Sequence, residues 1–483
     1  MIQKRKLIEL AILAAILCFS FYMAYIPHLD YPYPLHIDEW YHYGMSQELL
    51  EEGGLGFEEP FFGETAVEDN PEVGYHLFLS QIKLFTGLTW PDIFRFLPAF
   101  IFFFTAFTAY IFGQRSGFGL EAAFFICLIP TTVRILGPSF LVPVALGISL
   151  FPLILFLLHY FNKGVIKAFL LFLLLSFTFL MHPPTGVANS LVAGIYAVML
   201  ALGRRRERGW WRSPALILAA MSLSWLTIVL RYSSWIAESM RTIGEARGYY
   251  LPLVYDAFVK FGYLPLGLFV LGILLLALRR KARDWSLALS SAAFLGILVL
   301  FVRVQVGVPI MYDRGWMYFF LLAGIIAGFA TREVYLRCRK YLSPHIRKAP
   351  ALALSLVLVL MVISAFQGIQ NRLEEAYYHI INNEVYTDLI WIRENLDDSY
   401  QRAVVAPEMA IAFVPLTGKS IYASSAANQY TPARMTEVWE FFAGGASNTE
   451  WLIEKRIDIV YTRGLVNNPD LEKVAEHIYI LRR

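Results

Sequence analysis

Two adjacent carboxylates and two histidines lie close together in the stretch PLHIDEWYHYG, residues 34–44. Carboxylate and imidazole groups accept or deliver protons during a reaction, which is general acid–base catalysis. If a helix begins near Asp38, this residue and His42 lie one turn apart on the same face, and Glu39 lies on the neighbouring face. The stretch therefore indicates a candidate acid–base site just after an apolar segment.

The same stretch also has a purely structural interpretation. Asp38 is a favourable N-cap, and Glu39 suits the positive end of a helix dipole. Trp40, Tyr41 and Tyr43 are residue types that anchor a chain at a membrane surface. Spacing alone does not decide between the two interpretations.

The elements that must position these residues are membrane helices. The chain has 483 residues, of which 57% are hydrophobic and 16% charged, and its mean hydropathy is +0.53. Apolar runs of roughly 18 residues or more cross a bilayer as helices, and runs of this length exclude a barrel. The net charge of +3 is too close to neutral to indicate nucleic-acid binding. The three cysteines form no zinc or disulfide pattern.

We predict about eleven spanning helices, at residues 7–26, 93–112, 118–136, 139–159, 165–182, 184–203, 213–231, 258–279, 285–302, 315–331 and 349–368. The apolar stretch 73–88 is predicted to be interfacial, because the basic loops then all lie on one side. Under the positive-inside rule the N-terminus is cytoplasmic in a multi-pass protein of the cell membrane, and the C-terminus lies outside.

The outer side is predicted to carry two large parts. The first outer loop, Pro27–Glu72, holds twelve Asp or Glu residues and no Lys or Arg. After residue 368, short alternating segments such as DIVYT and HIYIL indicate strands, between helical stretches. We therefore expect a transmembrane domain at 1–368, with its first outer loop at 27–92 carrying interfacial helices, and an extracytoplasmic α/β domain at 369–483.

These motifs, in their order, resemble the GT-C superfamily of membrane glycosyltransferases. The segment HIDEWYHYGMSQELLEEG, followed by NPEVGYHLFLSQIKLFTGL and a spanning helix, is similar to the first outer loop of that superfamily. YDRGWMYFFLLAGIIAGFA (Tyr312–Ala330) is similar to a late helix with an Arg at its outer end. The C-terminal segments resemble the outer domain of prokaryotic members, such as protein O-mannosyltransferases and aminoarabinose transferases.

Two motifs of the superfamily are absent. The WWDYG motif of oligosaccharyltransferase subunits has no counterpart on the outer side, which argues against transfer of a whole oligosaccharide block. Metal-dependent members carry a second acidic motif in a later outer loop. The equivalent here, TTVRILGPSFLVP, contains Arg134 and no carboxylate. We therefore expect no cofactor, although a divalent ion, Mg²⁺ or Mn²⁺, stays open, with Asp38 as its ligand.

The resemblance implies a donor in which a sugar, such as mannose, is joined to a polyprenyl or dolichyl phosphate. Transfer requires a base for the acceptor hydroxyl and positive charge for the departing phosphate. Asp38 is the expected base, oriented by Glu39 or His42. The phosphate ligands are expected to be Arg303, Arg314 and Arg134. Three further residues are expected to support the site, namely His36, His182 and Tyr312.

Alternatives remain for these residues and for the chain. The arginines are also of a type that snorkels to lipid headgroups, and His182 is also suited to an ordinary interfacial hydrogen bond. The acceptor is a lipid, a glycan or a protein, and the bilayer is the other partner. Two other functions fit a chain of this composition: a transporter or flippase of lipid-linked sugars, and a non-catalytic scaffold whose outer domain binds a partner.

Overall fold

The computed structural model describes residues 2–63, 66–67, 70–233, 236–237, 251–279, 281–304, 309–341, 348–426 and 431–482. They form two compact units. We call Met1–Asp30 with Arg95–Ala376 the helical unit, and Tyr31–Phe94 with Tyr377–Arg483 the α/β unit.

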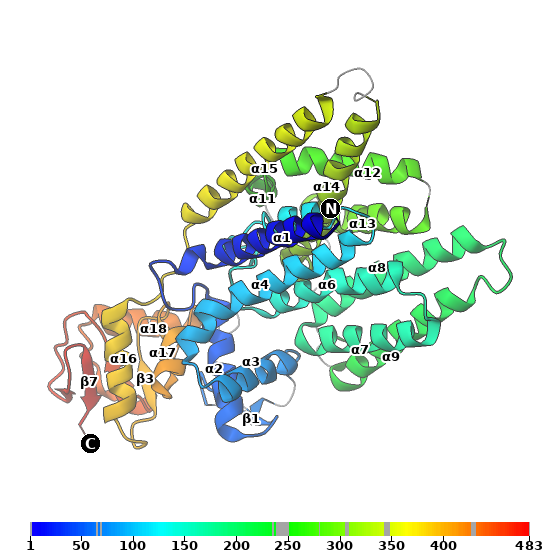
Figure 1. Cartoon of the computed structure of the whole chain (residues 1–483). Coiled ribbons are helices and arrows are strands. Elements are labelled where there is room, and N and C mark those ends of the chain that lie inside the picture. Colours follow the sequence, from blue (N-terminus) through cyan, green and yellow to red (C-terminus); the bar gives the residue numbers. More distant parts are fainter. Residues whose placement is uncertain are drawn as a thin grey trace. The chain divides into compact units, whose positions relative to one another are not determined.

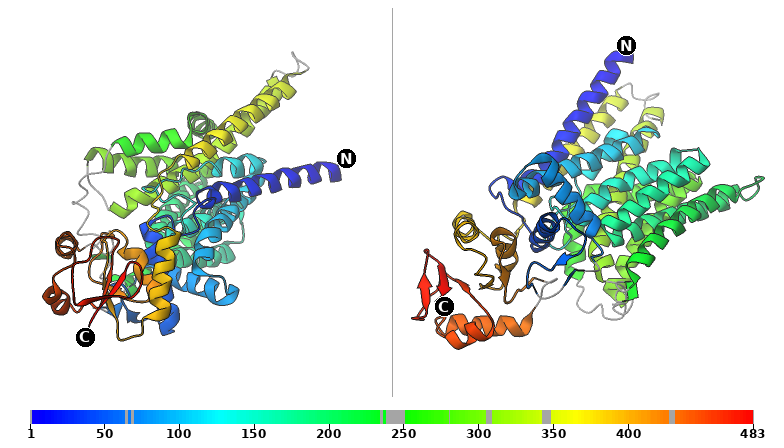
Figure 2. Two further views of the ribbon diagram at one scale, coloured as in Figure 1. Left: turned by 90° about the vertical axis from the view of Figure 1, so that its left-hand side faces the viewer. Right: turned by 90° about the horizontal axis from the view of Figure 1, so that it is seen from below.

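The helical unit consists of long apolar helices (Figures 1 and 2). Its elements are α1 (Ile2–Tyr25), η1 (Ile26–His28), α4 (Trp90–Gln114), α5 (Gly119–Ile126), α6 (Pro143–Tyr160), α7 (Gly164–Met181), α8 (Pro183–Arg204), α9 (Arg212–Arg231), α11 (Leu251–Phe261), α12 (Tyr263–Arg279), α13 (Ala282–Val304), α14 (Pro309–Tyr341) and α15 (Ala349–Leu373). Helix α7 packs against α8 and α9, and α14 packs against α5, α12 and α13. The chain is thus a polytopic α-helical membrane protein, as its composition predicts.

Nine helices in the described part of the chain are long and apolar enough to cross a membrane. Two of the eleven predicted spans, 118–136 and 258–279, are not among these nine. The span expected at 258–279 is divided at Gly262, which has a φ of +100°, and its apolar half α12 has 17 residues. The stretch expected to be interfacial forms α3 (Val73–Thr86), whose 14 residues are too short to cross a bilayer.

The continuous helix predicted at 118–136 is wrong in its second half, because α5 ends at Ile126. Pro130 has no N–H to donate, and Gly137 packs so closely on it that a Cβ there would lie 2.3 Å from the Pro130 carbonyl oxygen. The irregular backbone is instead satisfied by a distant side chain: buried Arg372 donates to the carbonyl oxygens of Ile129 at 2.7 Å and of Cys127 at 3.4 Å. At the depth of the bilayer core, non-helical backbone persists where it is buried in protein or lines a water-filled cavity.

The α/β unit contains α2 (Ile37–Glu52), β1 (Phe57–Glu58), β2 (Ala66–Val67) and α3, followed by α16 (Asn383–Asn395), β3 (Arg402–Val404), α17 (Ala410–Thr417), β4 (Ser420–Ile421), α18 (Pro432–Ala443), α19 (Thr449–Glu454), β5 (Ile459–Tyr461), β6 (Leu471–Lys473) and β7 (Ile478–Leu481). Five strands form one sheet in the order β4-β3-β5-β7-β6, in which β3 is parallel to both neighbours and β7 is antiparallel to both of its own. The predicted C-terminal α/β fold is confirmed.

The first outer loop packs with the C-terminal sheet region, although the sequence groups it with the transmembrane domain. Tyr31 donates its hydroxyl to the Ile381 carbonyl oxygen at 2.9 Å, and the Arg402 guanidinium donates to the Phe62 carbonyl oxygen at 2.9 Å. Helix α17 packs directly on α2. The helix that carries Asp38 is therefore supported by residues more than 300 positions later in the chain.

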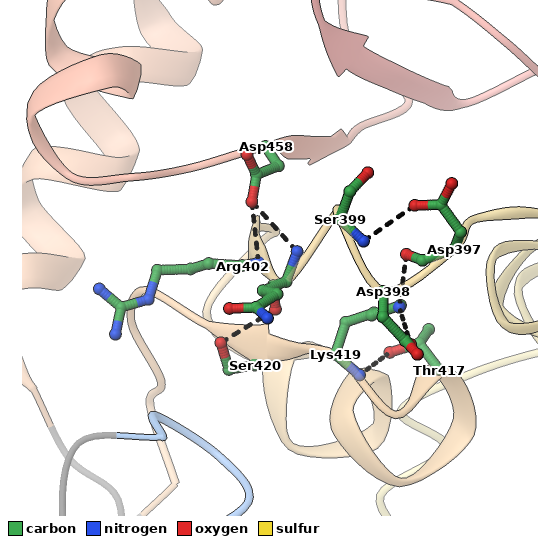
Figure 3. Close-up of polar contacts among 9 residues, drawn as sticks. Asp397, Asp398, Ser399, Arg402, Thr417, Lys419, Ser420 and Asp458 are labelled. Atoms are coloured by element: carbon green, nitrogen blue, oxygen red, sulfur yellow. Dashed lines mark hydrogen bonds and ion pairs between the residues drawn. The ribbon is translucent and has the colours of Figure 1, made fainter.

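Polar side chains near strands β3 and β4 contact one another and the adjacent loops (Figure 3). The Asp458 carboxylate accepts from the Gln401 backbone N–H at 3.1 Å, and its own backbone N–H donates to the Arg402 carbonyl oxygen at 2.9 Å. Buried Lys419 donates to the Asp397 carbonyl oxygen at 2.9 Å and lies 3.4 Å from the Asp398 carboxylate. We assign these residues a structural role, because their hydrogen bonds join β3, β4 and β5 to the adjacent loops.

Candidate active site

Helix α2 begins with a reciprocal cap formed by His36 and Glu39. His36 is the N-cap, and its Nδ1 accepts a hydrogen bond from the Asp38 backbone N–H at 3.0 Å. Glu39 reaches back with one carboxylate oxygen, Oε2, which accepts from the backbone N–H groups of Leu35 at 2.7 Å and His36 at 3.1 Å. Such a capping box satisfies backbone donors that the first turn of a helix leaves unpaired. Glu39 is fully buried and holds the start of the helix.

Asp38 is not the N-cap that the structural interpretation of the sequence requires. It occupies the second position of α2, because the helix begins at Ile37 and His36 supplies the cap. Its side chain keeps 20% of its surface exposed, and one carboxylate oxygen lies 3.7 Å from His36 Nδ1. That nitrogen accepts a backbone hydrogen bond, so it carries no proton, and the approach of Asp38 to it is not a salt bridge. The helix start is complete without the Asp38 carboxylate as its cap.

The aromatic residues that follow form a packed layer, so they are not simple surface anchors. Trp40 and Tyr43 are buried, and Tyr43 packs against the rings of Trp90 and Phe94. Burial raises the pKa of the Tyr41 and Tyr43 hydroxyls well above the ordinary value, so both remain neutral. The aromatic side chains of the first turns of α2 therefore pack against other rings of the same unit.

His42 is drawn into contact with a residue that the sequence reasoning missed. Its Nδ1 lies 2.9 Å from Nε2 of His76 on α3, and the other nitrogen of His76 lies 2.7 Å from the Asn70 amide nitrogen. All three side chains are buried. The sequence signal for this contact is weak, since His76 is an isolated histidine in an apolar helix.

The helical unit brings two of the predicted residues together. His182, between α7 and α8, contacts the Thr185 hydroxyl at 2.7 Å, and this hydroxyl contacts that of Tyr318 at 2.7 Å. Arg314 precedes Tyr318 by four residues on α14, which places it one helical turn from the end of this chain of contacts. His182 is therefore a buried partner in a polar chain of side chains beside a cation.

The other predicted cations lie elsewhere in the helical unit. Arg303 is exposed in the last turn of α13. Arg134 is exposed in the turn that replaces the second half of the predicted span 118–136. Tyr312 belongs to α14, but its side chain lies outside the described part of the structure.

Comparison with known proteins was made at the level of sequence and of structure. No protein-family model matches the chain, and no curated protein matches it. Among solved structures, the oligosaccharyltransferase of Archaeoglobus fulgidus tethered with an acceptor peptide superposes with a TM-score of 0.61 at 12% identity, over 94% of this chain and 68% of that chain. The arabinofuranosyltransferase AftD from Mycobacteria superposes with a TM-score of 0.59 at 18% identity, over 96% of this chain and 37% of that chain.

The chain has the GT-C fold. The Archaeoglobus enzyme, AglB, is also known in complex with an inhibitory peptide and a dolichol-phosphate, and in complex with Zn and sulfate, with TM-scores of 0.61 and 0.59. At these identities the likeness establishes the GT-C fold of this chain and leaves its substrates to be argued from its own residues.

A metal ion would require several carboxylate, imidazole or thiolate ligands placed close together. In the described ranges, no group of three or more His, Cys, Asp or Glu side chains is placed to hold a metal ion. Glu39 uses a carboxylate oxygen in the cap of α2, and the turn at residues 133–136 carries the exposed cation Arg134. Within the described residues, Asp38 is thus not part of a three-ligand set of His, Cys, Asp or Glu.

Two charged residues of the α15 region were missed by sequence reasoning, which looked for cations only at the ends of earlier helices. Arg372 binds the carbonyl groups that follow α5. Glu375 forms an ion pair with Lys260 and accepts from the Val133 backbone N–H at 3.4 Å. Together they hold the turn that carries Arg134. Arg372 lies in the last turn of α15 and Glu375 just after its end, and the available signal in the sequence was the presence of these charges directly after an apolar run.

Proposed function

We propose that this protein is an integral membrane glycosyltransferase that moves a sugar from a polyprenyl-phosphate-linked donor to an acceptor at the outer face of the cell membrane. The observation that carries the proposal is the start of α2. His36 and Glu39 complete the cap there, and Asp38 presents a partly exposed carboxylate beside it, in a chain with the GT-C fold. We therefore assign the reacting carboxylate of this helix start to Asp38 and the capping carboxylate to Glu39.

Asp38 is the proposed general base. As the bond between the anomeric carbon and the donor phosphate breaks, the acceptor hydroxyl forms the new glycosidic bond and its proton passes to the Asp38 carboxylate. The leaving group departs as polyprenyl phosphate, which is already a weak base and needs no general acid. One carboxylate therefore suffices for proton transfer, and Glu39 acts by holding the helix start.

Positive charge is proposed to stabilise the departing phosphate. Arg314 is the first candidate, because its side chain is half-buried and it lies one helical turn before Tyr318, whose hydroxyl contacts that of Thr185. A guanidinium offers two parallel N–H donors to a phosphate, which a lysine does not. Arg303 and Arg134, both exposed, are proposed as secondary ligands.

The class of donor is inferred from chemistry, with support from a structural neighbour. The AglB neighbour was solved with a dolichol-phosphate, so a chain of the same fold is known to hold such a lipid. The acceptor in this protein is proposed to be a lipid, a glycan or a protein. Under the positive-inside rule, the N-terminus is proposed to be cytoplasmic and the α/β unit extracellular.

The direct test is transfer of labelled sugar. Purified protein is incubated with radiolabelled polyprenyl-phosphate sugars and a membrane extract, and the labelled product is identified. Asp38→Asn is the matched variant, since it keeps the shape of the side chain and removes its basicity. We expect label to move to an acceptor with the native protein and to move ~10²–10⁴-fold more slowly with the variant.

Other outcomes would identify the alternative functions. Label that crosses a vesicle membrane on its original lipid carrier would indicate a flippase. A protein that neither transfers nor translocates any donor, yet retains a partner through its α/β unit, would be a scaffold. Equal rates of transfer for the native protein and Asp38→Asn would remove Asp38 from the mechanism.

A further inference from the structure

The contact between His42 and His76 defines a hydrogen-bonded chain of three buried side chains. It runs from Asn70 through His76 on α3 to His42 on α2. The centres of the His42 and His76 rings lie 5.2 Å apart. The Tyr75 ring packs edge-to-face against His42, with 5.0 Å between the ring centres. A second bond joins the same helices, from the Ser80 hydroxyl to the Ser46 carbonyl oxygen at 2.7 Å. The two imidazoles are therefore held in a fixed relation.

The orientation of the Asn70 amide determines which nitrogen of His76 carries a proton. Asn70 Oδ1 accepts from the Glu72 backbone N–H at 2.9 Å, so the amide oxygen is committed to that donor. The NH₂ group of Asn70 consequently faces His76 Nδ1 at 2.7 Å. An NH₂ group only donates, so Nδ1 of His76 must accept and carries no proton. Neutral His76 then has its proton on Nε2.

The proton on His76 in turn determines the tautomer of His42. His76 Nε2–H donates across 2.9 Å to His42 Nδ1, which therefore accepts and is unprotonated. Neutral His42 carries its proton on Nε2, on the side of the ring away from His76. Burial lowers the pKa of His76 to about 3, so protonation does not disturb this arrangement near neutral pH.

The resulting donor lies on the helix face that carries the proposed base. His42 follows Asp38 by four residues on α2, and side chains at this spacing are neighbours on a helix surface. We propose that Asn70 and His76 are positioning residues that lock His42 as the Nε2–H tautomer, so that His42 is a permanent donor that orients the Asp38 carboxylate. This inference rests on the proposed function only in the part that concerns Asp38.

Asparagine and glutamine distinguish the two nitrogens of His76. A glutamine amide reaches about the position of a histidine Nε2, and an asparagine amide reaches about that of Nδ1. His76→Gln therefore preserves a donor to His42, and His76→Asn removes it. We expect kcat to fall at least ~10-fold in His76→Asn with little change in the KM of the donor, and His76→Gln to recover most of that loss.

Replacing Asn70 by aspartate reverses the chain without changing its shape. The new carboxylate still accepts from the Glu72 backbone N–H, but it also accepts from His76, which moves the His76 proton to Nδ1. Nε2 of neutral His76 then has no proton to donate, so His42 must present Nδ1–H to it and Nε2 loses its donor. Asn70→Asp is thus expected to lower kcat as His76→Asn does, although the hydrogen bond from the Glu72 backbone N–H is kept.

Solid-state NMR of the protein labelled with ¹⁵N-histidine identifies the tautomers independently of any activity assay. In the native protein we expect His42 and His76 both as Nε2–H, and in Asn70→Asp at pH 8 both as Nδ1–H. His42 in the Nδ1–H form in the native protein would overturn the lock, and so would native kcat in both His76→Asn and Asn70→Asp. If the native protein transfers no sugar but shows the expected tautomers, the proposed function fails and the lock stands.

Discussion

Asp38 and Glu39 are chemically similar neighbours, and the structure predicts opposite consequences of changing them. Glu39 Oε2 accepts from the backbone N–H groups of Leu35 and His36, in a buried environment. Glu39→Ala leaves both donors unsatisfied, and each buried donor without a partner costs about 1–3 kcal/mol. The free energy of unfolding should therefore fall by roughly 2–6 kcal/mol.

Two matched variants sharpen this prediction. In Glu39→Gln the amide oxygen can still accept both backbone hydrogen bonds. The free energy of unfolding should then fall only by the contribution of the negative charge, about 1 kcal/mol per bond. In Asp38→Asn the cap is untouched, so stability should change by less than about 0.5 kcal/mol while turnover falls by ~10²–10⁴. Turnover of the folded fraction of Glu39→Gln should remain close to native.

The assay combines thermal unfolding of the detergent-purified protein, followed by tryptophan fluorescence, with sugar transfer measured on the same samples. At roughly 2–4 °C per kcal/mol for a unit of this size, Glu39→Ala should lower the midpoint by roughly 4–24 °C. The assignment of roles is refuted if Glu39→Gln unfolds at the native temperature and transfers no sugar. It is also refuted if Asp38→Asn lowers the midpoint as much as Glu39→Ala does.

Four further predictions follow from the described residues. For topology, Cys338 should react only with membrane-permeant thiol reagents in intact cells, and exposed Glu450, changed by Glu450→Cys, should react with impermeant ones; equal accessibility contradicts the proposed orientation. Arg314→Ala should raise the donor KM and lower kcat, and Arg314→Lys should restore only part of both, whereas native kinetics in both variants would exclude Arg314 as a phosphate ligand. EDTA should leave most of the transfer activity, and complete loss restored by Mn²⁺ or Mg²⁺ would show that Asp38 binds a metal ion. His76 has a folded pKa of about 3 against an ordinary 6.5, so the unfolded state binds more protons between these values and stability should fall as pH falls from about 6.5 towards 3, with a shallower fall in His76→Gln.

The sequence predicts the elements whose signals are local. The spanning helices follow from apolar length alone, because a bilayer leaves the backbone few other ways to satisfy its polar groups. The strands β3, β4, β5 and β7 follow from short alternation of apolar residues. The position of the candidate base also follows, since the adjacent carboxylates after the first helix are visible in HIDEWYH.

Breaks in these elements depend on partners that no local pattern shows. The helix predicted at 118–136 stops at Ile126, and its freed carbonyl groups are satisfied by Arg372, about 240 residues later. An apolar run cannot reveal such a partner, because hydropathy records composition and not the source of a hydrogen bond. The sequence did contain Pro130 and Gly137, which lower helical stability but do not by themselves determine where a helix ends.

The chemical roles inside HIDEWYH were decided by tertiary structure. By composition, Asp38 and His36 are both able to cap a helix, and the three-dimensional path of the chain before Ile37 makes His36 the cap and turns Glu39 back onto the backbone. The tautomer of His42 depends on Asn70 and His76, which lie about 30 residues away and come into contact only because α3 packs on α2. The sequence by itself therefore determined which groups are present and near which helix. Only packing decided which of them hold the start of α2 and which contact α3, because a hydrogen bond requires both its partners within about 3 Å.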